Sequence, residues 1–241
     1  MNNLTIFVCT HTDFQMPVTA PFYKILDSRK LNDDVTKEGL PGSYYSELHN
    51  YRYAAENMEL PDYVGFCGYR KYFRFAGNVS EDAIIKYVDK RGCITGELAD
   101  FGLMSVREHY AYNHNKEDLE LLEYTVRDVA PEFIPAFTKS LFGHQMYTCN
   151  MFIMKKEDFL ELNRFIFKIM DAFTERLLSS CTSVNDHVEE AFHKGLLRFG
   201  SVSHQSRIGG YLGERLVSAY IMAKFPDAYS AGMIMTGERI R

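Results

Sequence analysis

The sequence predicts an α/β fold in which a mostly parallel sheet carries helices on both faces. Short apolar, β-branched runs alternate with longer segments of helical periodicity, an order typical of parallel sheets. Apolar residues make up 46% of the 241 residues, which is enough for one large core. Because no repeat, low-complexity segment or linker interrupts the pattern, we expect a single domain over residues 1–241.

The N-terminal elements follow from two apolar runs and the helical segment between them. Residues 4–10 (LTIFVCT) are predicted as a buried first strand, and residues 62–67 (DYVGFC) as a second. Residues 44–58 place apolar side chains along one face at helical spacing. The polar stretch at 27–43 is predicted to be a long loop, and such loops in compact domains are often functional.

Capping residues mark the elements in the middle of the chain. Ser80 is a predicted N-cap for a helix that has acidic residues in its first turn and ends at Gly92. Residues 100–106 (DFGLMSV) are predicted as a third strand. Asn115 is predicted to cap a helix over residues 115–129, which stops before a proline.

The C-terminal third is predicted to be mostly helical. Residues 146–154 (MYTCNMFIM) form the fourth expected strand. Amphipathic helices are expected over residues 155–178 and 184–197. A last helix over residues 213–224 should stop at Pro226.

Charge and cysteine content exclude several protein classes. The net charge of −5 argues against a general nucleic-acid binder. The five cysteines are odd in number and form no C-x-x-C pair, which argues against a zinc site and a disulfide framework. The first residues do not resemble a signal peptide, and no run of about 18 apolar residues occurs. We therefore expect a cytoplasmic protein with reduced thiols.

Several common catalytic signatures are missing. The sequence contains no G-x-x-x-x-G-K-[ST] loop, no G-x-G-x-x-G after a strand and no G-x-S-x-G elbow. These absences argue against a P-loop kinase, a dinucleotide enzyme and a serine hydrolase. The eight histidines are scattered, and their spacing does not predict a metal site.

Polar residues follow the first two predicted strands, where ligands of open α/β sheets bind. Thr10 and His11 end the first strand, and a hydroxyl and an imidazole there can bind a base or a ribose. A capped turn explains these residues equally well. Residues 68–74 (GYRKYFR) follow the second strand and interleave cations with aromatics, so Tyr69 and Arg70 can hold a diphosphate. The alternative is a solvated basic turn.

Two later segments carry further candidates. Asn150 stands in an otherwise apolar strand, and a buried amide needs partners, such as a sugar hydroxyl or neighbouring backbone. Residues 207–215 (RIGGYLGER) contain glycines that permit close approach of backbone to a ligand. Glu214 is expected near the start of the last helix, where it can deprotonate an acceptor hydroxyl. The alternative is a glycine loop followed by an ordinary helix-start glutamate.

Five segments, taken in order, resemble a bacterial glycosyltransferase family of the GT-A superfamily, long catalogued as a domain of unknown function and found in capsular and exopolysaccharide gene clusters. The first is the IFVCTH strand at 6–11. Residues 44–57 (YYSELHNYRYAAEN) are similar to Y-C-E-L-T-x-x-Y-W-A-W-K-N, and residues 62–73 to D-Y-I-G-L-C-H-Y-R-R-Y-F. NMFIMKKEDF at 150–159 and R-x-G-G-Y-L-G-E-R-L at 207–216 complete the pattern.

The resemblance implies a GT-A (Rossmann-like) sheet and transfer of a sugar from a nucleotide donor, expected to be a UDP-sugar. It implies that Glu214 is the catalytic base. The implied donor-binding residues are Thr10, His11, Tyr45, Glu47, Tyr69, Arg70, Asn150 and Arg207. Among these, the residues at the end of the first strand would contact the nucleotide. The residues of the turn after the second strand would contact the diphosphate, and Asn150 would contact the sugar.

The resemblance leaves two expectations for the metal. Most GT-A enzymes hold Mn²⁺ or Mg²⁺ through a D-x-D at a strand end, and none occurs at the corresponding position here. Asp33 and Asp34 are the fallback ligands. The other expectation is that Arg70, with Lys71 or Arg74, replaces part of the metal's charge.

The expected acceptor is a glycan or lipid-linked glycan in bacterial surface polysaccharide synthesis, with peripheral contact at the inner face of the membrane as a further option. The family's histidine in H-Y-R-R-Y is Gly68 here, so one donor contact is changed. An alternative acceptor is a hydroxylated nucleobase of phage-like DNA. Another alternative is a nucleotide-sugar or glycan binding protein that has lost catalysis. The oligomeric state stays open.

Overall fold

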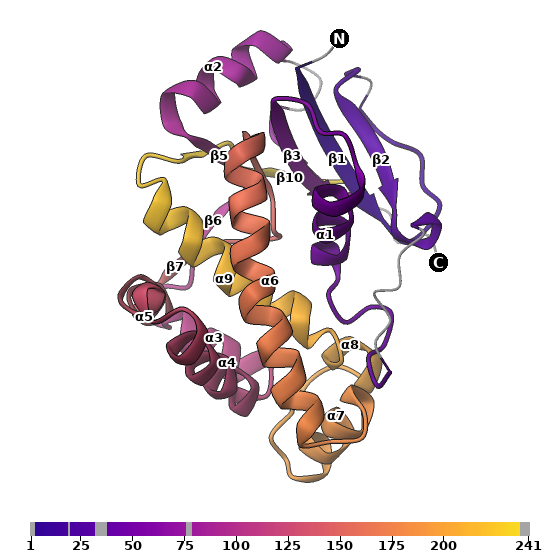
Figure 1. Cartoon of the computed structure of the whole chain (residues 1–241), viewed down its shortest axis with the longest axis vertical. Coiled ribbons are helices and arrows are strands. Elements are labelled where there is room, and N and C mark those ends of the chain that lie inside the picture. The colour runs from indigo at the N-terminus through magenta and orange to yellow at the C-terminus, as the bar shows by residue number, and fades with distance from the viewer. Residues whose placement is uncertain (1–2, 19, 32–37, 76–78, 237–241) are drawn as a thin grey trace.

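The computed structural model describes residues 3–18, 20–31, 38–75 and 79–236 (Figure 1). Its main sheet has eight strands. At one side, β1 (Leu4–Thr10) lies between β2 (Tyr23–Asp27) and β3 (Tyr63–Gly68), and all three run parallel. Every residue of β1 is buried, as its continuous apolar run predicts. The strands predicted at 4–10 and 62–67 are confirmed.

The other side of the sheet is mixed in direction. β8 (Phe152–Lys155) runs antiparallel between β3 and β5 (Cys93–Thr95), and β9 (Tyr229–Ser230) pairs parallel with β5. β4 (Lys71–Phe73) turns back from the end of β3, and β10 (Met233–Met235) pairs with it. The antiparallel position of β8 determines which end of that strand reaches the candidate site.

Helices cover both faces of the main sheet, as predicted. On one face, α2 (Glu81–Arg91) packs Ile84 and Val88 into a cluster that includes Ile6 of β1. The other face is covered by α1 (Glu47–Asn57), α6 (Lys156–Ser179) and α9 (Ile208–Lys224). Figure 1 shows α6 and α9 crossing in the middle of the molecule.

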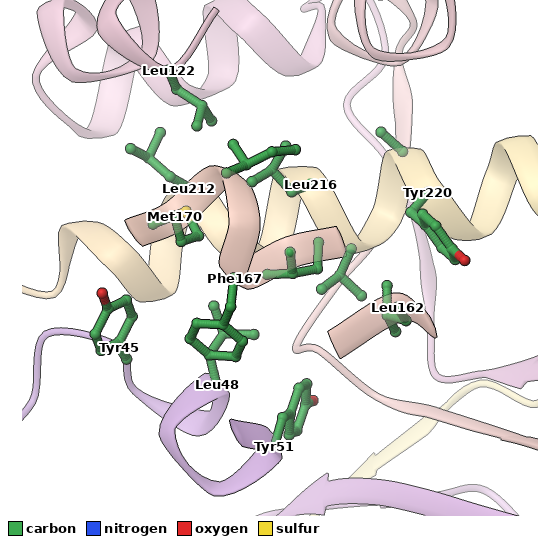
Figure 2. Close-up of a cluster of buried hydrophobic side chains, with 14 of the residues drawn as sticks. Tyr45, Leu48, Tyr51, Leu122, Leu162, Phe167, Met170, Leu212, Leu216 and Tyr220 are labelled. Carbon is green, nitrogen blue, oxygen red and sulfur yellow. The ribbon is translucent and has the colours of Figure 1, made fainter. Parts of the chain in front are cut away.

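The larger core cluster is built where α1, α4, α6 and α9 converge (Figure 2). Phe167 and Met170 of α6 lie between Leu48 of α1 and Leu212 of α9, and all four side chains are buried. Burying each such side chain stabilises the fold by roughly 1.5–3 kcal/mol.

The remaining helices form a second region beside α6 and α9. In chain order they are α3 (Val106–Asn113), α4 (Lys116–Val129), α5 (Ile134–Phe142), α7 (Val184–His193) and α8 (Val202–Gln205). The 3₁₀ turns are η1 (Ser28–Lys30) and η2 (Pro131–Phe133). A small separate sheet pairs β6 (Leu98–Asp100) with β7 (Gln145–Tyr147).

Two predicted strands are wrong in extent. Residues 100–106 are not a strand, because the Asp100 carboxylate accepts from Gly102 N in a turn and Ser105 then caps α3. The Ser105 hydroxyl and the Glu108 carboxylate form a capping box. The apolar residues of DFGLMSV favour a strand instead, so this helix start was not predicted. Residues 146–154 are two short strands, β7 and β8, separated by a turn through Cys149 and Asn150.

The predicted helices are confirmed with shifted ends. Ser80 caps α2 by accepting from Ala83 N, and Gly92 ends it with φ 75°, as predicted. Asn115 caps α4. The helix expected at 184–197 ends at His193, and the helix expected to begin at 213 begins at Ile208.

Candidate active site

The carboxyl ends of β1 and β3 and the amino end of β8 meet at one edge of the main sheet. Cys9 of β1 lies opposite Gly68 at the end of β3. Because β8 is antiparallel to β3, the residues that reach this edge are Cys149 and Asn150, which precede β8. The segment after Met154 lies at the opposite edge of the sheet.

At the end of β1, Thr10 adopts the capped turn that was one of its two interpretations. Its hydroxyl donates to Thr12 O at 2.7 Å and accepts from Thr12 N at 3.1 Å. His11 is exposed, and its ring stands edge-on to Tyr69 with centroids 5.5 Å apart. The β1 end therefore offers an accessible imidazole beside an aromatic ring.

The turn after β3 is fixed to β1 by a backbone bond from Tyr69 N to Cys9 O of 3.0 Å. The guanidinium of Arg70 lies 5.0 Å from the Tyr69 ring centroid and is exposed. A cation held over an aromatic ring keeps its donors available for an anion. The structure thus places Tyr69, Arg70 and His11 together.

Lys71 of β4 interacts with three ionisable groups of this edge, Cys149, Glu47 and Glu214. Burial lowers the pKa of its ammonium. The nearby Cys149, Glu47 and Glu214 raise that pKa by more, so it stands above its usual value. Lys71 therefore stays charged at neutral pH, facing carboxylates from both α1 and α9.

The turn before β8 has an unusual backbone. Cys149 and Asn150 have φ of 68° and 51°, a left-handed conformation that non-glycine residues rarely adopt. Cys149 N donates to the Glu214 carboxylate, and the Tyr51 hydroxyl donates to Asn150 O. The side-chain Oδ1 of Asn150 is buried and has no hydrogen-bond partner within the described residues. That oxygen is an acceptor available for a ligand hydroxyl or amide.

Glu214 lies within α9 rather than at its start, which corrects the expected helix-start position. Its two carboxylate oxygens accept from Cys149 N and from Arg215, the latter at 2.9 Å. Arg215 is only 3% exposed, and its other contacts are Tyr211 O and His109 Nδ1. These bonds fix the orientation of a carboxylate whose side chain remains 20% exposed.

Arg207 joins the starts of α9 and α1, because its Nε donates to Ser46 Oγ at 2.9 Å. Glu47 follows Ser46 as the first residue of α1 and is half-buried. Tyr45, in contrast, belongs to the core: it is 4% exposed, and its hydroxyl lies 3.2 Å from Thr174 Oγ1 (Figure 2). Burial raises the pKa of Tyr45 to about 12.

The described residues do not form a metal site. Within 3–18, 20–31, 38–75 and 79–236, no three His, Cys, Asp or Glu side chains are grouped to hold an ion. Asp33 and Asp34, the fallback ligands, lie outside the described residues. Glu47 and Glu214 face an ammonium instead, which a divalent cation at the same position would have to displace.

From the sequence, Lys71 is expected only to add to the charge of Arg70. No role is expected there for Cys149, Ser46 or Arg215. Arg215 could have been found, because an arginine between Leu212 and Leu216 on an apolar helix needs buried partners. Nothing in the sequence places Cys149 beside Glu214, since that contact depends on the direction of β8.

Comparisons with known proteins support the fold. The profile of a family described as Domain of unknown function (DUF4422) matches residues 5–197. No curated protein is significantly similar in sequence. The fold is similar to the apo structure of the bifunctional glycosyltransferase WbbM, with a TM-score of 0.70 and 18% identity. The alignment covers 98% of this chain and 45% of the WbbM chain, so this chain spans less than half of that protein.

The similarity to WbbM at this identity establishes the fold alone, and it confirms the predicted Rossmann-like α/β architecture. In the part of the chain that the structure describes, no helix has the length and apolar character needed to span a bilayer.

Proposed function

We propose, from the premise that the chain belongs to the DUF4422 family, that it is a glycosyltransferase which moves a sugar from a nucleotide-sugar donor to an acceptor hydroxyl. The family membership and the fold confirm the resemblance identified from the sequence motifs. The activity itself is inferred from the chemistry of the site.

The observation that carries the proposal is the charge arrangement at the carboxyl edge of the sheet. Arg70 and Lys71 supply adjacent cations where a diphosphate would lie, and Glu47 and Glu214 supply carboxylates beside them. Donors that are already positioned stabilise a developing negative charge without reorganising. The unpartnered Oδ1 of Asn150 adds an acceptor for a sugar hydroxyl.

The proposed reaction is a displacement at the anomeric carbon. The acceptor oxygen forms a bond to that carbon while the bond to the diphosphate oxygen breaks, and the nucleoside diphosphate leaves with the bonding electrons. Glu214 takes the proton of the acceptor hydroxyl. Inversion is favoured, because it needs a base and no second nucleophile. In this proposal His11, at the exposed end of β1, contacts the nucleotide, with Thr10 beside it.

Arg70 and Lys71 carry the charge of the leaving diphosphate in this proposal. A divalent ion bound by GT-A enzymes supplies the same neutralisation. Because Glu47 and Glu214 interact with the Lys71 ammonium, and no three His, Cys, Asp or Glu side chains of the described residues are grouped to hold an ion, no step here is routed through a metal. Full turnover in the presence of a chelator is therefore expected, and strict dependence on Mn²⁺ would assign the role to ligands such as Asp33 and Asp34.

A second candidate function is nucleotide-sugar binding without turnover. One observation favours it: both oxygens of Glu214 already accept hydrogen bonds, from Cys149 N and from Arg215, so the carboxylate also has a structural role. The proposed acceptor is a bacterial surface glycan or its lipid-linked form. A hydroxylated nucleobase is the less favoured acceptor, given the net charge of −5.

Thermal unfolding with nucleoside diphosphates and their sugars tests donor binding directly. We expect UDP and UDP-sugars to raise Tm, because a ligand at 100 times its Kd stabilises the folded state by about 2.7 kcal/mol. Equal shifts with chelator and with Mn²⁺ are expected. No shift with any nucleotide would contradict the proposed donor site.

Glu214→Gln separates the two candidate functions. We expect turnover to fall by about 10²–10⁴, as for loss of a general base, with donor affinity nearly unchanged. Glu175→Gln, at an exposed position on α6, is the matched control. If Glu214→Gln turns over normally while Glu47→Gln does not, Glu47 is the base. Binding without any turnover in the wild type would establish the second candidate.

A further inference from the structure

A groove lies between α3 and the loop that follows α7, outside the candidate active site. Its volume is about 700 Å³. Its walls include Leu103, Met104 and Tyr112 on one side and Leu196 and Arg198 on the other, with Lys116 at the start of α4. We call this feature the α3 groove. Pockets that hold small molecules have volumes of about 300–1,000 Å³.

The mouth of the α3 groove exposes large apolar side chains. Leu103 is 99% exposed and Tyr112 is 55% exposed. Phe199, beside the groove, is 46% exposed and packs its ring 5.4 Å from that of Tyr112. Clustered exposed apolar side chains mark binding surfaces more often than scattered ones do.

The α3 groove also carries positive charge that the protein does not use internally. Lys116 and Arg198 are exposed, and within the described ranges neither forms an ion pair. The one acidic residue of the groove, Glu108, is engaged in the capping box with Ser105. An apolar surface next to two exposed cations, neither paired with an acidic group of the described residues, matches a molecule with an apolar chain next to an anionic head.

We propose that the α3 groove binds the phosphate head and adjacent acyl chain of an anionic membrane lipid and so docks the protein on a bilayer surface. A protein partner would need a wider complementary face, of about 800 Å² per partner. Because the whole chain carries a net charge of −5, attraction to an anionic surface must come from local cations such as these.

Side-chain contacts lead from the end of α3 towards the candidate active site. α3 leads into His114, whose ring stacks on Tyr211 of α9 at 4.0 Å. Tyr211 in turn lies near the charges of Glu47 and Glu214. A bilayer docked at the groove would therefore lie beside the helices that build the site. The proposal concerns binding and does not depend on the proposed activity.

Flotation with vesicles tests the proposal. We expect wild-type protein to bind vesicles of phosphatidylcholine with 30% phosphatidylglycerol, and to bind pure phosphatidylcholine at least tenfold less. Lys116→Glu/Arg198→Glu should weaken binding to the anionic vesicles at least tenfold, because each cation contributes its own attraction to the anionic surface. Leu103→Ser should weaken it severalfold. Lys86→Glu/Lys168→Glu, with the same charge change at exposed sites on α2 and α6, should bind like wild type.

Each groove variant must unfold at the same temperature as the wild type. Weaker vesicle binding then reports lost docking and not lost folding. Each of the following results would overturn the proposal. One is a failure of the wild type to bind anionic vesicles, or equal binding by wild type and Lys116→Glu/Arg198→Glu. Another is a dimer in light scattering that Leu103→Ser dissociates, which would make a second copy the occupant. The third is saturable binding of inorganic phosphate in the groove with no vesicle binding.

Discussion

At Lys71, burial and charge act on one ammonium in opposite directions. Burial favours the neutral amine, whereas Cys149, Glu47 and Glu214 favour the cation, and together these three groups prevail. The resulting charge is less hydrated than one on the surface, so it acts more strongly on an incoming diphosphate. Arg70, which is exposed, lacks that advantage.

Replacing Lys71 by methionine tests this role. We expect kcat to fall about 10²–10³-fold, the loss typical of removing one preorganised donor to a developing anion. Lys71→Arg should retain much of the activity, because it keeps the charge. Lys24→Met, at an exposed position of β2, is the control. Steady-state kinetics in which KM rises and kcat stays constant would make Lys71 a ground-state contact only.

Single residues of the site could be predicted where they end a strand. Thr10, His11, Tyr69 and Arg70 were identified because the carboxyl ends of parallel strands meet at one edge. The bond from Cys149 N to Glu214 could not be predicted, because it depends on a left-handed turn at Cys149 that no glycine signals. Asn150 was identified as a buried amide in an apolar strand, although it precedes β8 rather than lying within it.

At the scale of elements, the glycines of α9 allow its first turns to contact the start of α1. A Cβ at Gly213 would overlap Leu48 Cδ1, and one at Gly210 would overlap the Ser46 side chain. Leu48 is 1% exposed, so it has little room to move aside. These contacts set the position of Glu47 relative to Glu214, and they explain why R-I-G-G-Y-L-G is helix rather than loop.

Gly213→Ala is expected to destabilise the protein in spite of alanine's higher helix propensity. The propensity gain is about 1 kcal/mol, whereas an added methyl in a packed core costs about 1–3 kcal/mol. A net loss of about 1 kcal/mol would lower Tm by about 2–4 °C in a chain of this size. Calorimetry on purified variants measures it.

Gly42→Ala serves as the control for that substitution, because a Cβ there meets nothing within 4 Å. Its Tm should equal that of the wild type or exceed it slightly. If Gly213→Ala is as stable as Gly42→Ala, the close approach of α1 and α9 is looser than the structure shows.

Helices that begin or end at a recognisable capping residue were predicted well. Strands predicted only from a run of apolar residues were predicted less well. Ser80, Gly92 and Asn115 each mark a helix end through a backbone hydrogen bond or a positive φ. Residues 100–106 contain the same kinds of apolar residue as a strand, but Ser105 competes for the backbone and begins α3. Short strands such as β5 carry too few residues for periodicity to reveal them.

For the whole molecule, the sequence order of strands and helices was enough to predict an α/β fold but not the path of the sheet. β8 pairs with β3 across more than 80 residues, and nothing local indicates its antiparallel direction. α6 and α9 contact both the sheet and the helical region (Figure 1), so the two regions share one core. That a single domain spans residues 1–241 remains a prediction.

His114 connects the helical region to α8 and α9. Its Nδ1 lies 2.8 Å from Gln205 Oε1, its ring stacks on Tyr211, and it is 9% exposed. Burial lowers the pKa of His114 to about 4. The hydrogen bond with Gln205 opposes this shift, and the charge of Arg215 adds to it by a smaller amount. Nearby, His187 donates to the buried Asp118 at 2.7 Å, and this bond raises the pKa of His187.

These shifts predict how stability changes with pH. The unfolded chain protonates His114 near its ordinary pKa of 6.5, whereas the folded protein resists until about 4, so the unfolded state binds more protons between these values. The free energy of unfolding should therefore fall on acidification from about pH 7 to pH 5, by about 2 kcal/mol from His114 alone. His187 has the opposite sign, because its raised pKa contributes stability that is lost as the pH rises. Urea unfolding at pH 7 and pH 5 should show this loss of free energy of unfolding in the wild type and in a variant of the exposed His193. The loss should be much smaller in His114→Asn. An equal loss in His114→Asn would place the acid sensitivity in the carboxylates instead.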